Sequence, residues 1–431
     1  MIFMPPIRSN WPQPLYGRGT FRRVSASCAW MTGCARPPTK RASTFWGSTR
    51  RGMRLKVALW SAMLTIIVGA GAAAAPSMAT WQWGRAFRKC TFSHAGYVKS
   101  LGCVVYNAAI PGKAGEEDGV GVVETQEIVA PKPFTMAIPS WNASTPDGSY
   151  IVVFLKVRAD GVWSKWCKLT LYNTKGNPEP RQSCKDGDDI VFSECSAVGV
   201  RDPKRADAVR LRFELRSTDG KTYPTLRFVG VNTNDPTPEG MFDKAEPDKS
   251  VWGTELDIPY LSQLSVKGGS VWCSPTSVAM VLGYWSKRLN RPDLVVGITD
   301  AAAGIRDNAL RGTGNWGMNT AFAGEFPGIK AYVDRFSSLS RVEYYIGKGV
   351  PVIVSHDYGL LNHWKNSAGH LAVVRGFTKD GDIILNDPWT PADKLDQVRK
   401  VFKRADFEAC WLGPKGSEGT VYVIYPQWYR L

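Results

Sequence analysis

The chain changes its sequence pattern at a proline-rich segment, residues 234–250. This segment carries three prolines and no regular spacing of apolar residues, which is typical of a boundary between domains. Before it, apolar and polar residues alternate, as along residues 209–215, and a period of two predicts strands with one buried face. After it, apolar residues recur at helical spacing from Ser274, and strand-like runs follow. We therefore expect a multidomain protein with an N-terminal β domain and a C-terminal α+β domain, joined by a linker over residues 236–250.

The predicted strands before the linker are short, and Gly, Pro, Asn and Asp turn signals separate them. About six such strands without a helical pattern predict a β-sandwich over residues 119–235. The expected strands cover residues 134–138, 150–159, 163–172, 189–195, 209–215 and 225–231. Residues 80–118 have no clear period, and Cys90 and Cys103 could close a small loop there, so we interpret them as a short preamble to the sandwich.

The N-terminal region resembles an export signal. Residues 53–79 combine Arg54 and Lys56, an apolar stretch and the small-residue site Ser77-Met78-Ala79, which is the layout of a cleaved secretory signal peptide. An uncleaved membrane anchor is the alternative. Residues 1–52 contain no acidic residue and no apolar period, and we interpret them as a disordered tail or as sequence upstream of the true start. We expect a protein that is secreted or held at the cell envelope, with no membrane span after cleavage.

The positive charge is concentrated at the N-terminus. The chain of 431 residues has a formal net charge of +16, yet eleven of its basic residues precede position 80 and the first acidic residue is Glu116. The exported part therefore carries about +5, which does not indicate a nucleic-acid partner. The chain contains four histidines, and its cysteines lack zinc-ribbon spacing, so we expect no metal and no cofactor.

The exported part has an odd number of cysteines. In an oxidising compartment six of the seven could form three disulfides, and one would remain. The seven are Cys90, Cys103, Cys167, Cys184, Cys195, Cys273 and Cys410. Cys273 precedes Ser274-Pro275 and an apolar helical pattern, so we place it at the N-terminus of a buried helix, where backbone N–H groups favour a thiolate. The alternatives are a half-cystine or a small core residue at Cys273, with Cys410 as the other candidate for the unpaired thiol.

A thiolate nucleophile needs a base and a group that orients the base. His370 begins an apolar run over residues 371–377, and Gly381 turns the chain into a second run that ends at Asp387. If the two runs pair as a hairpin, Asp387 lies near His370 and completes a nucleophile, base and orienting group. His356 and His363 are interpreted as solvated turn residues. Gln263, ten residues before Cys273, could act with the Cys273 N–H as an oxyanion donor.

These motifs together resemble a known family of secreted bacterial enzymes. The matching segments are Ile258-Pro259-Tyr260-Leu261-Ser262-Gln263, the run from Gly268 to Ser277, Gly314-Asn315-Trp316, Gly369-His370-Leu371 and Asn386-Asp387-Pro388. Over about residues 250–426 they resemble the "like" branch of the bacteriocin-processing cysteine peptidases, peptidase family thirty-nine. The resemblance implies a papain-like fold, with Cys273 as nucleophile, His370 as base, Asp387 as orienting group and Gln263 as oxyanion donor. Trp272 stands where leader-processing members carry an acidic residue, so leader processing is not implied.

The sequence therefore favours a secreted thiol hydrolase that cleaves a peptide or isopeptide bond in a peptide or protein, including one of the cell envelope. A thiol acyltransferase of the same fold is the first alternative, since an amine or thiol would then replace water. The second alternative is an envelope-binding protein with an inactive peptidase-like domain. Trp141 or Trp163 would then offer stacking surfaces, although a core position is the simpler expectation for both.

Overall fold

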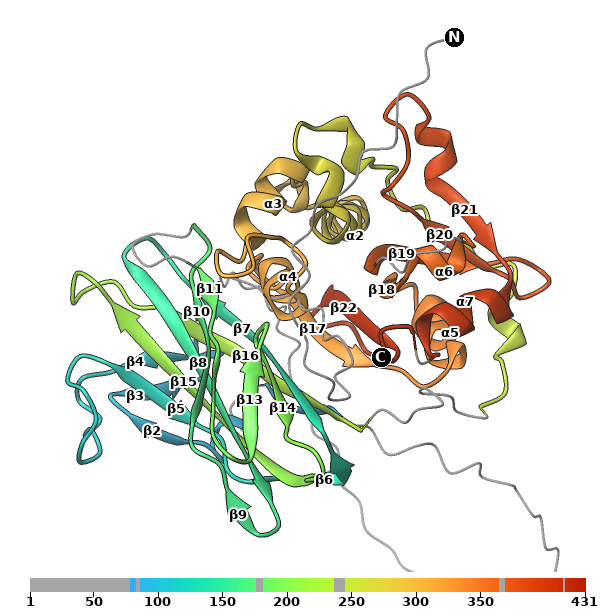
Figure 1. The fold of residues 1–431 in the computed structure, drawn as a ribbon. Helices are drawn as coiled ribbons and strands as arrows, with labels where there is room; N and C mark the ends of the chain where they lie inside the picture. The colour runs from blue at the N-terminus through green and yellow to red at the C-terminus, as the bar shows by residue number, and fades with distance from the viewer. Residues whose placement is uncertain (1–77, 83–85, 176–180, 236–244, 364–368, 414) are drawn as a thin grey trace, which may run out of the picture.

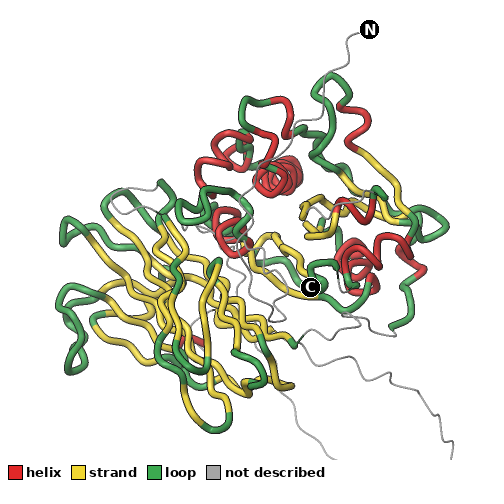
Figure 2. The backbone as a smooth tube through the Cα atoms, in the orientation of Figure 1, coloured by secondary structure: helices red, strands yellow, loops and turns green. Residues whose placement is uncertain are grey.

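A computed structural model describes residues 78–82, 86–175, 181–235, 245–363, 369–413 and 415–431. The strands of residues 78–235 form two antiparallel sheets, whereas most helices belong to the region after residue 245 (Figures 1 and 2). Across the described residues, no helix is both long and apolar enough to cross a membrane. The predicted signal segment lies outside the described residues up to position 77, and its last two residues, Met78 and Ala79, already pair with β16 in strand β1.

The two N-terminal sheets each contain eight strands. The first has the order β12-β13-β14-β7-β16-β4-β3, with β1 paired to β16. Its strands are β1 (Met78–Gln82), β3 (Ala95–Val98), β4 (Cys103–Tyr106), β7 (Met136–Ser144), β12 (Asp186–Gly187), β13 (Val191–Glu194), β14 (Ala197–Val200) and β16 (Thr225–Asn234). The second has the order β11-β10-β8-β15-β5-β2, with β6 paired to β15 and β9 to β8. Its strands are β2 (Thr91–Ser93), β5 (Gly121–Glu124), β6 (Ile128–Phe134), β8 (Ser149–Ala159), β9 (Val162–Trp163), β10 (Cys167–Tyr172), β11 (Gln182–Ser183) and β15 (Ala206–Ser217).

The longest strand pair, β8 with β15, contains the alternating apolar and polar residues 209–215. β8 and β15 pair from Ser149↔Ser217 to Ala159↔Ala206. Along residues 209–215 the apolar side chains are buried and Arg210 and Arg212 are half-buried, whereas Glu214 is buried and pairs with Arg212. Trp141 on β7 lies 6.4 Å from the Phe213 ring and 6.3 Å from the Tyr172 ring, both on the other sheet. Trp141 is therefore a core residue and not a surface for stacking a ligand.

The interpretation of residues 80–118 as a separate preamble is not what the structure shows. These residues supply β2, β3 and β4, which are hydrogen-bonded into the two sheets. The pairing was missed because these strands are only three or four residues long, too short to establish a period. No disulfide joins any of the seven described cysteines, so the expected pairing of six of them is not formed in the structure.

The C-terminal domain is built on one six-stranded antiparallel sheet with the order β17-β22-β18-β19-β20-β21. Its strands are β17 (Ile329–Arg335), β18 (Val352–Asp357), β19 (Gly369–Phe377), β20 (Ile383–Asn386), β21 (Arg399–Phe402) and β22 (Thr420–Pro426). Helices α2 (Cys273–Leu289), α3 (Ile298–Ile305) and α4 (Trp316–Ala323) lie on one side, and α5 (Leu339–Gly347), α6 (Tyr358–Leu361) and α7 (Arg404–Trp411) on the other (Figure 1). Short 3-10 turns complete the domain: η1 (Lys249–Val251), η2 (Gln263–Ser265), η3 (Gly269–Val271), η4 (Pro292–Leu294) and η5 (Leu395–Val398).

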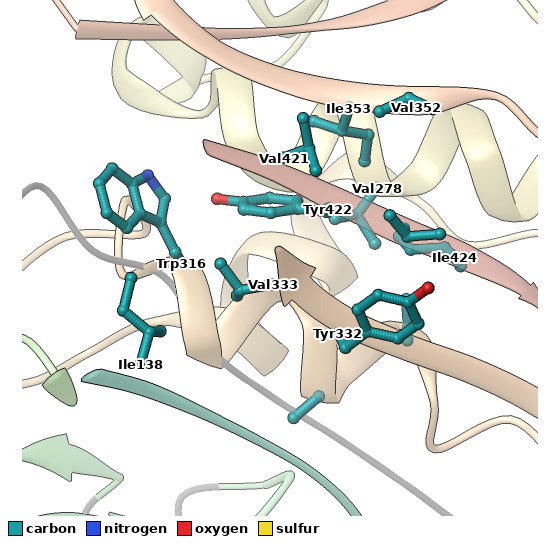
Figure 3. Close-up of a cluster of buried hydrophobic side chains, with 14 of the residues drawn as sticks. Ile138, Val278, Trp316, Tyr332, Val333, Val352, Ile353, Val421, Tyr422 and Ile424 are labelled. Atoms are coloured by element: carbon teal, nitrogen blue, oxygen red, sulfur yellow. The ribbon is translucent and has the colours of Figure 1, made fainter. Parts of the chain in front are cut away.

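The two domains share an interface along β17, the edge strand of the C-terminal sheet. The Asn142 side chain donates to the Ala331 carbonyl at 2.7 Å, and Ser140 Oγ accepts the Val333 N–H at 3.0 Å. Side chains of the N-terminal domain thus form hydrogen bonds with backbone groups of the edge strand β17 that could otherwise pair with another strand. Apolar packing continues across this interface, where Ile138 lies beside Trp316 (Figure 3).

Candidate active site

Cys273 is the first residue of α2, as its sequence context predicts. The helix packs against β19, and Cys273 is partly buried between them. Burial opposes ionisation of the thiol, but a hydrogen bond with His370, the charge of that imidazole and the N–H groups of Leu371 and Ser274 outweigh it and lower the pKa of Cys273. A thiol with this environment is stabilised as a thiolate and is correspondingly nucleophilic.

His370 is the second residue of β19 and is buried. Its Nε2 lies 2.7 Å from Asp387 Oδ1, which leaves Nδ1 as the ring atom for the hydrogen bond with Cys273. Burial disfavours the imidazolium, yet the carboxylate of Asp387 and the neighbouring sulfur overcome this effect and raise the pKa of His370 to about 9. The opposite shifts at the thiol and the imidazole favour a thiolate–imidazolium pair.

Asp387 directly follows β20, and β19 and β20 form the antiparallel pair that the sequence predicts. The carboxylate is buried and accepts the Trp389 N–H at 2.9 Å through Oδ1, in addition to His370. Its Oδ2 lies 2.6 Å from Lys400 Nζ, and the Tyr358 hydroxyl is a further partner. Burial raises the pKa of this carboxyl, but the charges and hydrogen bonds of His370 and Lys400 lower it well below its ordinary value.

Gln263 contacts both the segment that follows Asp387 and the segment that leads to Cys273. Its backbone N–H donates to the Pro388 carbonyl at 2.9 Å, and its Nε2 donates to the Gly269 carbonyl at 2.8 Å. One amide hydrogen remains beyond that bond, and the buried Oε1 has no hydrogen-bond partner among the described residues. A Cβ on Gly269 would lie 1.8 Å from the Gln263 carbonyl oxygen, so only glycine allows this close approach.

Three neighbours of the predicted site were not found from the sequence. Tyr358 lies with its ring centroid 4.7 Å from that of His370, and Lys400 contacts Asp387. Lys400 is on β21, and no clear sequence pattern predicts that this strand pairs with β20. The interpretation of His356 as a solvated turn residue is wrong: it is buried on β18 opposite His370, with the two rings 5.5 Å apart. Burial, with the charge of His370, lowers the pKa of His356 to about 3, so it stays neutral.

The other described cysteines do not share the features of Cys273. Cys410 is buried in α7 and donates to the Phe407 carbonyl at 3.1 Å, and burial raises the pKa of its thiol. Burial also raises the pKa of Cys184, which is partly exposed. Among the described residues, no group of three or more His, Cys, Asp or Glu side chains could hold a metal ion.

Family models match both halves of the chain. Residues 255–417 match the Peptidase C39-like family, and residues 100–234 match the Peptidase C39 N-terminal domain. Over these two regions the chain is therefore similar to C39-like peptidases. The C39-like region contains all four residues that the sequence placed in the site, and the N-terminal match covers most of the two β-sheets.

A solved structure also resembles this C39-like protein. It is described as a candidate C39-like peptidase from Bacillus anthracis, with 17% sequence identity and a TM-score of 0.28, and the match covers 40% of this chain and 96% of that one. No curated protein matches the chain.

Proposed function

We propose that this C39-like protein is a cysteine peptidase that hydrolyses a peptide or isopeptide bond. The observation that carries the proposal is the sequence of contacts from Cys273 at the start of α2, through the buried His370, to the carboxylate of Asp387. We also propose a papain-like arrangement for the C-terminal domain and a face-to-face β-sandwich for the N-terminal sheets. The helix-borne nucleophile, the strand-borne base and the Trp141–Phe213 contact support these assignments.

In the proposed reaction the Cys273 thiolate attacks the carbonyl carbon of the substrate and forms a C–S bond. The second amide hydrogen of Gln263 and the Cys273 N–H stabilise the oxyanion. His370 gives its proton to the departing amine as the C–N bond breaks. Water then attacks the thioester, His370 takes its proton, and the carboxylate product leaves the regenerated thiolate.

The proposed location is outside the cytoplasm, at the cell envelope or beyond it, with peptides or proteins of that compartment as substrates. This proposal rests on the signal-peptide pattern of residues 53–79. Because the pKa of the Cys273 thiol is lowered, its thiolate would serve as the nucleophile in that compartment, and the proposed reaction needs no cofactor.

The test is alkylation of the full chain with iodoacetamide at pH 7, mapping of the modified residue, and hydrolysis of a casein-derived peptide mixture. We expect rapid labelling at Cys273 and loss of at least about a thousandfold in hydrolysis in Cys273→Ala. Cys184→Ala is the matched control, because Cys184 is the other partly exposed described cysteine, and it should retain activity. Undiminished hydrolysis by Cys273→Ala would refute the proposal, and transfer of the acyl group to an added amine in preference to water would identify an acyltransferase.

A further inference from the structure

The N-terminal domain contacts the C39-like domain at the end of α3 and at the loop that follows it, residues 307–313. Arg181, which is buried, donates through Nε to the Arg306 carbonyl at 2.9 Å and through Nη2 to the Ala303 carbonyl. These carbonyls belong to the C-terminal end of α3, where helix carbonyls lack intrahelical partners and a cation is favoured. The Arg181 carbonyl in turn accepts the Asn308 N–H at 3.0 Å.

Asp307, the first residue of the loop 307–313, is fully buried and is held by both domains. Its Oδ1 accepts the N–H of Ser183 from the N-terminal domain and the N–H of Ala309 from its own loop, both at 3.0 Å. Its Oδ2 accepts from the Asn315 amide, which also donates to Ser196 of the N-terminal domain at 3.2 Å. Removal of the N-terminal partners would leave the buried Asp307 carboxylate with fewer hydrogen bonds, all of them from its own domain.

The same loop contacts the segment that leads to the nucleophile. Thr313 Oγ1 donates to the Val271 carbonyl at 3.1 Å, and the Asn319 amide holds the Thr313 carbonyl at 2.9 Å. Val271 ends η3 and is two residues before Cys273. The first residue of η3, Gly269, accepts the hydrogen bond from Gln263. The loop therefore supports the segment on which the thiol and the oxyanion donor depend.

We propose that the N-terminal domain is a positioning part of the active site and not a tethered binding module. Arg181 and Ser183 hold the loop 307–313, and Thr313 of that loop fixes the backbone between Gly269 and Cys273. The catalytic consequence rests on the proposed function, whereas the positioning of this backbone is a property of the fold alone. Arg181, Ser183, Asp307 and Thr313 are positioning residues, since they act on Cys273 through other groups.

The test compares three variants of the full chain by hydrogen–deuterium exchange of residues 266–273, thermal unfolding and peptide hydrolysis. Arg181→Met keeps the apolar stem and removes the guanidinium, and Thr313→Val removes only the hydroxyl. Arg227→Met is the matched control, because Arg227 is a buried arginine of the same interface that donates to the Gly324 carbonyl at the end of α4.

We expect exchange in residues 266–273 to accelerate about tenfold in Arg181→Met and Thr313→Val, with a comparable fall in kcat and little change in KM. Arg227→Met should lower the Tm without changing exchange in this segment. Unchanged exchange in Thr313→Val, or equal effects of the two arginine variants on the segment, would overturn the proposal. Because exchange can also be measured in a Cys273→Ala background, a failure of the proposed catalysis is distinguishable from a failure of the positioning role.

Discussion

At the residue scale, the candidate site is governed by charges around His370. Asp387 stabilises the imidazolium, and Lys400 places a positive charge 2.6 Å from the other oxygen of the same carboxylate. Lys400 therefore reduces the negative potential that His370 experiences. Its ammonium also fixes the carboxylate, so the two effects of Lys400 on catalysis have to be separated by pH dependence.

The hydrolysis rate of the unaltered protein should rise with pH through the lowered pKa of Cys273 and fall as His370 loses its proton near pH 9. In Lys400→Met we expect this basic limb to move to higher pH by about one unit, because Asp387 then acts on the imidazolium without an opposing charge. The measurement is the pH profile of kcat/KM between pH 5 and pH 11.

The control for this prediction is Lys403→Met, which removes an exposed lysine that pairs with Asp382, away from His370. Its basic limb should stay near pH 9. If kcat/KM of Lys400→Met falls without a shift of the basic limb, Lys400 only holds Asp387 in place. A shift of this limb to lower pH would contradict the electrostatic argument.

Cys273, His370 and Asp387 could be predicted because each stands at a recognisable position, whereas Gln263 alone gives almost no signal and is supported by the family resemblance. A thiol precedes Ser-Pro and a helical pattern, and a histidine begins one apolar run while an aspartate ends the next. Tyr358, Lys400 and His356 carry no such signal. Their roles depend on which strands are neighbours, and the pairing of β18 and β21 to the central strands is not encoded in local spacing.

At the scale of elements, the turns η2 and η3 determine where Gln263 lies relative to α2. They touch at Gly269, where a Cβ would lie 1.8 Å from the Gln263 carbonyl oxygen. Because that oxygen belongs to the backbone, the clash could be relieved only by moving one turn away from the other.

We expect Gly269→Ala to lower kcat by about a hundredfold, since a displacement on the order of 1 Å in a reacting group has an effect of this size. KM should change less. The readouts are peptide hydrolysis and the alkylation rate of Cys273. Gly369→Ala serves as the control, because a Cβ there meets no atom within 4 Å. Wild-type activity in Gly269→Ala would show that the close approach of the turns is not needed.

Most elements around the site could be predicted with small boundary errors. Helix α2 begins one residue before Ser274, where the helical spacing of apolar residues starts. The expected strand over residues 163–172 is instead two strands, β9 and β10, and the run over residues 134–138 is divided between β6 and β7. When only a short break separates two strands, the apolar pattern continues across it, so the sequence does not show where the first strand ends and the second begins.

At the scale of the whole molecule, the two domains bury polar groups in one shared interface. Asp334 on β17 is largely buried and accepts the Asn232 amide and the Arg335 N–H, each at 2.8 Å. Burial raises the pKa of Asp334 to about 6, even though both hydrogen bonds and the charge of Arg341 act in the opposite direction. The interface therefore binds a proton more tightly in the folded state than in the unfolded chain.

A group whose pKa is raised on folding stabilises the fold below its unfolded pKa, and this contribution is lost as pH rises through the folded value. Between about pH 4 and pH 6, Asp334 should therefore lower the free energy of unfolding by up to about 3 kcal/mol. Asp334→Asn should remove this dependence, so the stability of the variant relative to the unaltered protein should increase from pH 4 to pH 7. Urea unfolding at both pH values measures it.

The exposed Asp393→Asn is the control for the Asp334 prediction and should follow the unaltered protein at both pH values. The prediction fails if the difference between Asp334→Asn and the unaltered protein is the same at pH 4 and pH 7. Such a result would mean that Asp334 remains charged in the folded protein throughout this range.

The sequence by itself determined the two structural classes along the chain, the helix that begins at Cys273 and the order of the four candidate site residues. These features depend on local periodicity and on residue types at the ends of elements, which are readable without contacts. The tertiary structure decided that residues 80–118 join the N-terminal sheets, that Lys400 and Tyr358 reach Asp387, and that the N-terminal domain contacts the loop 307–313. These features depend on strand order and on side chains that are distant in the chain, and no local pattern specifies either.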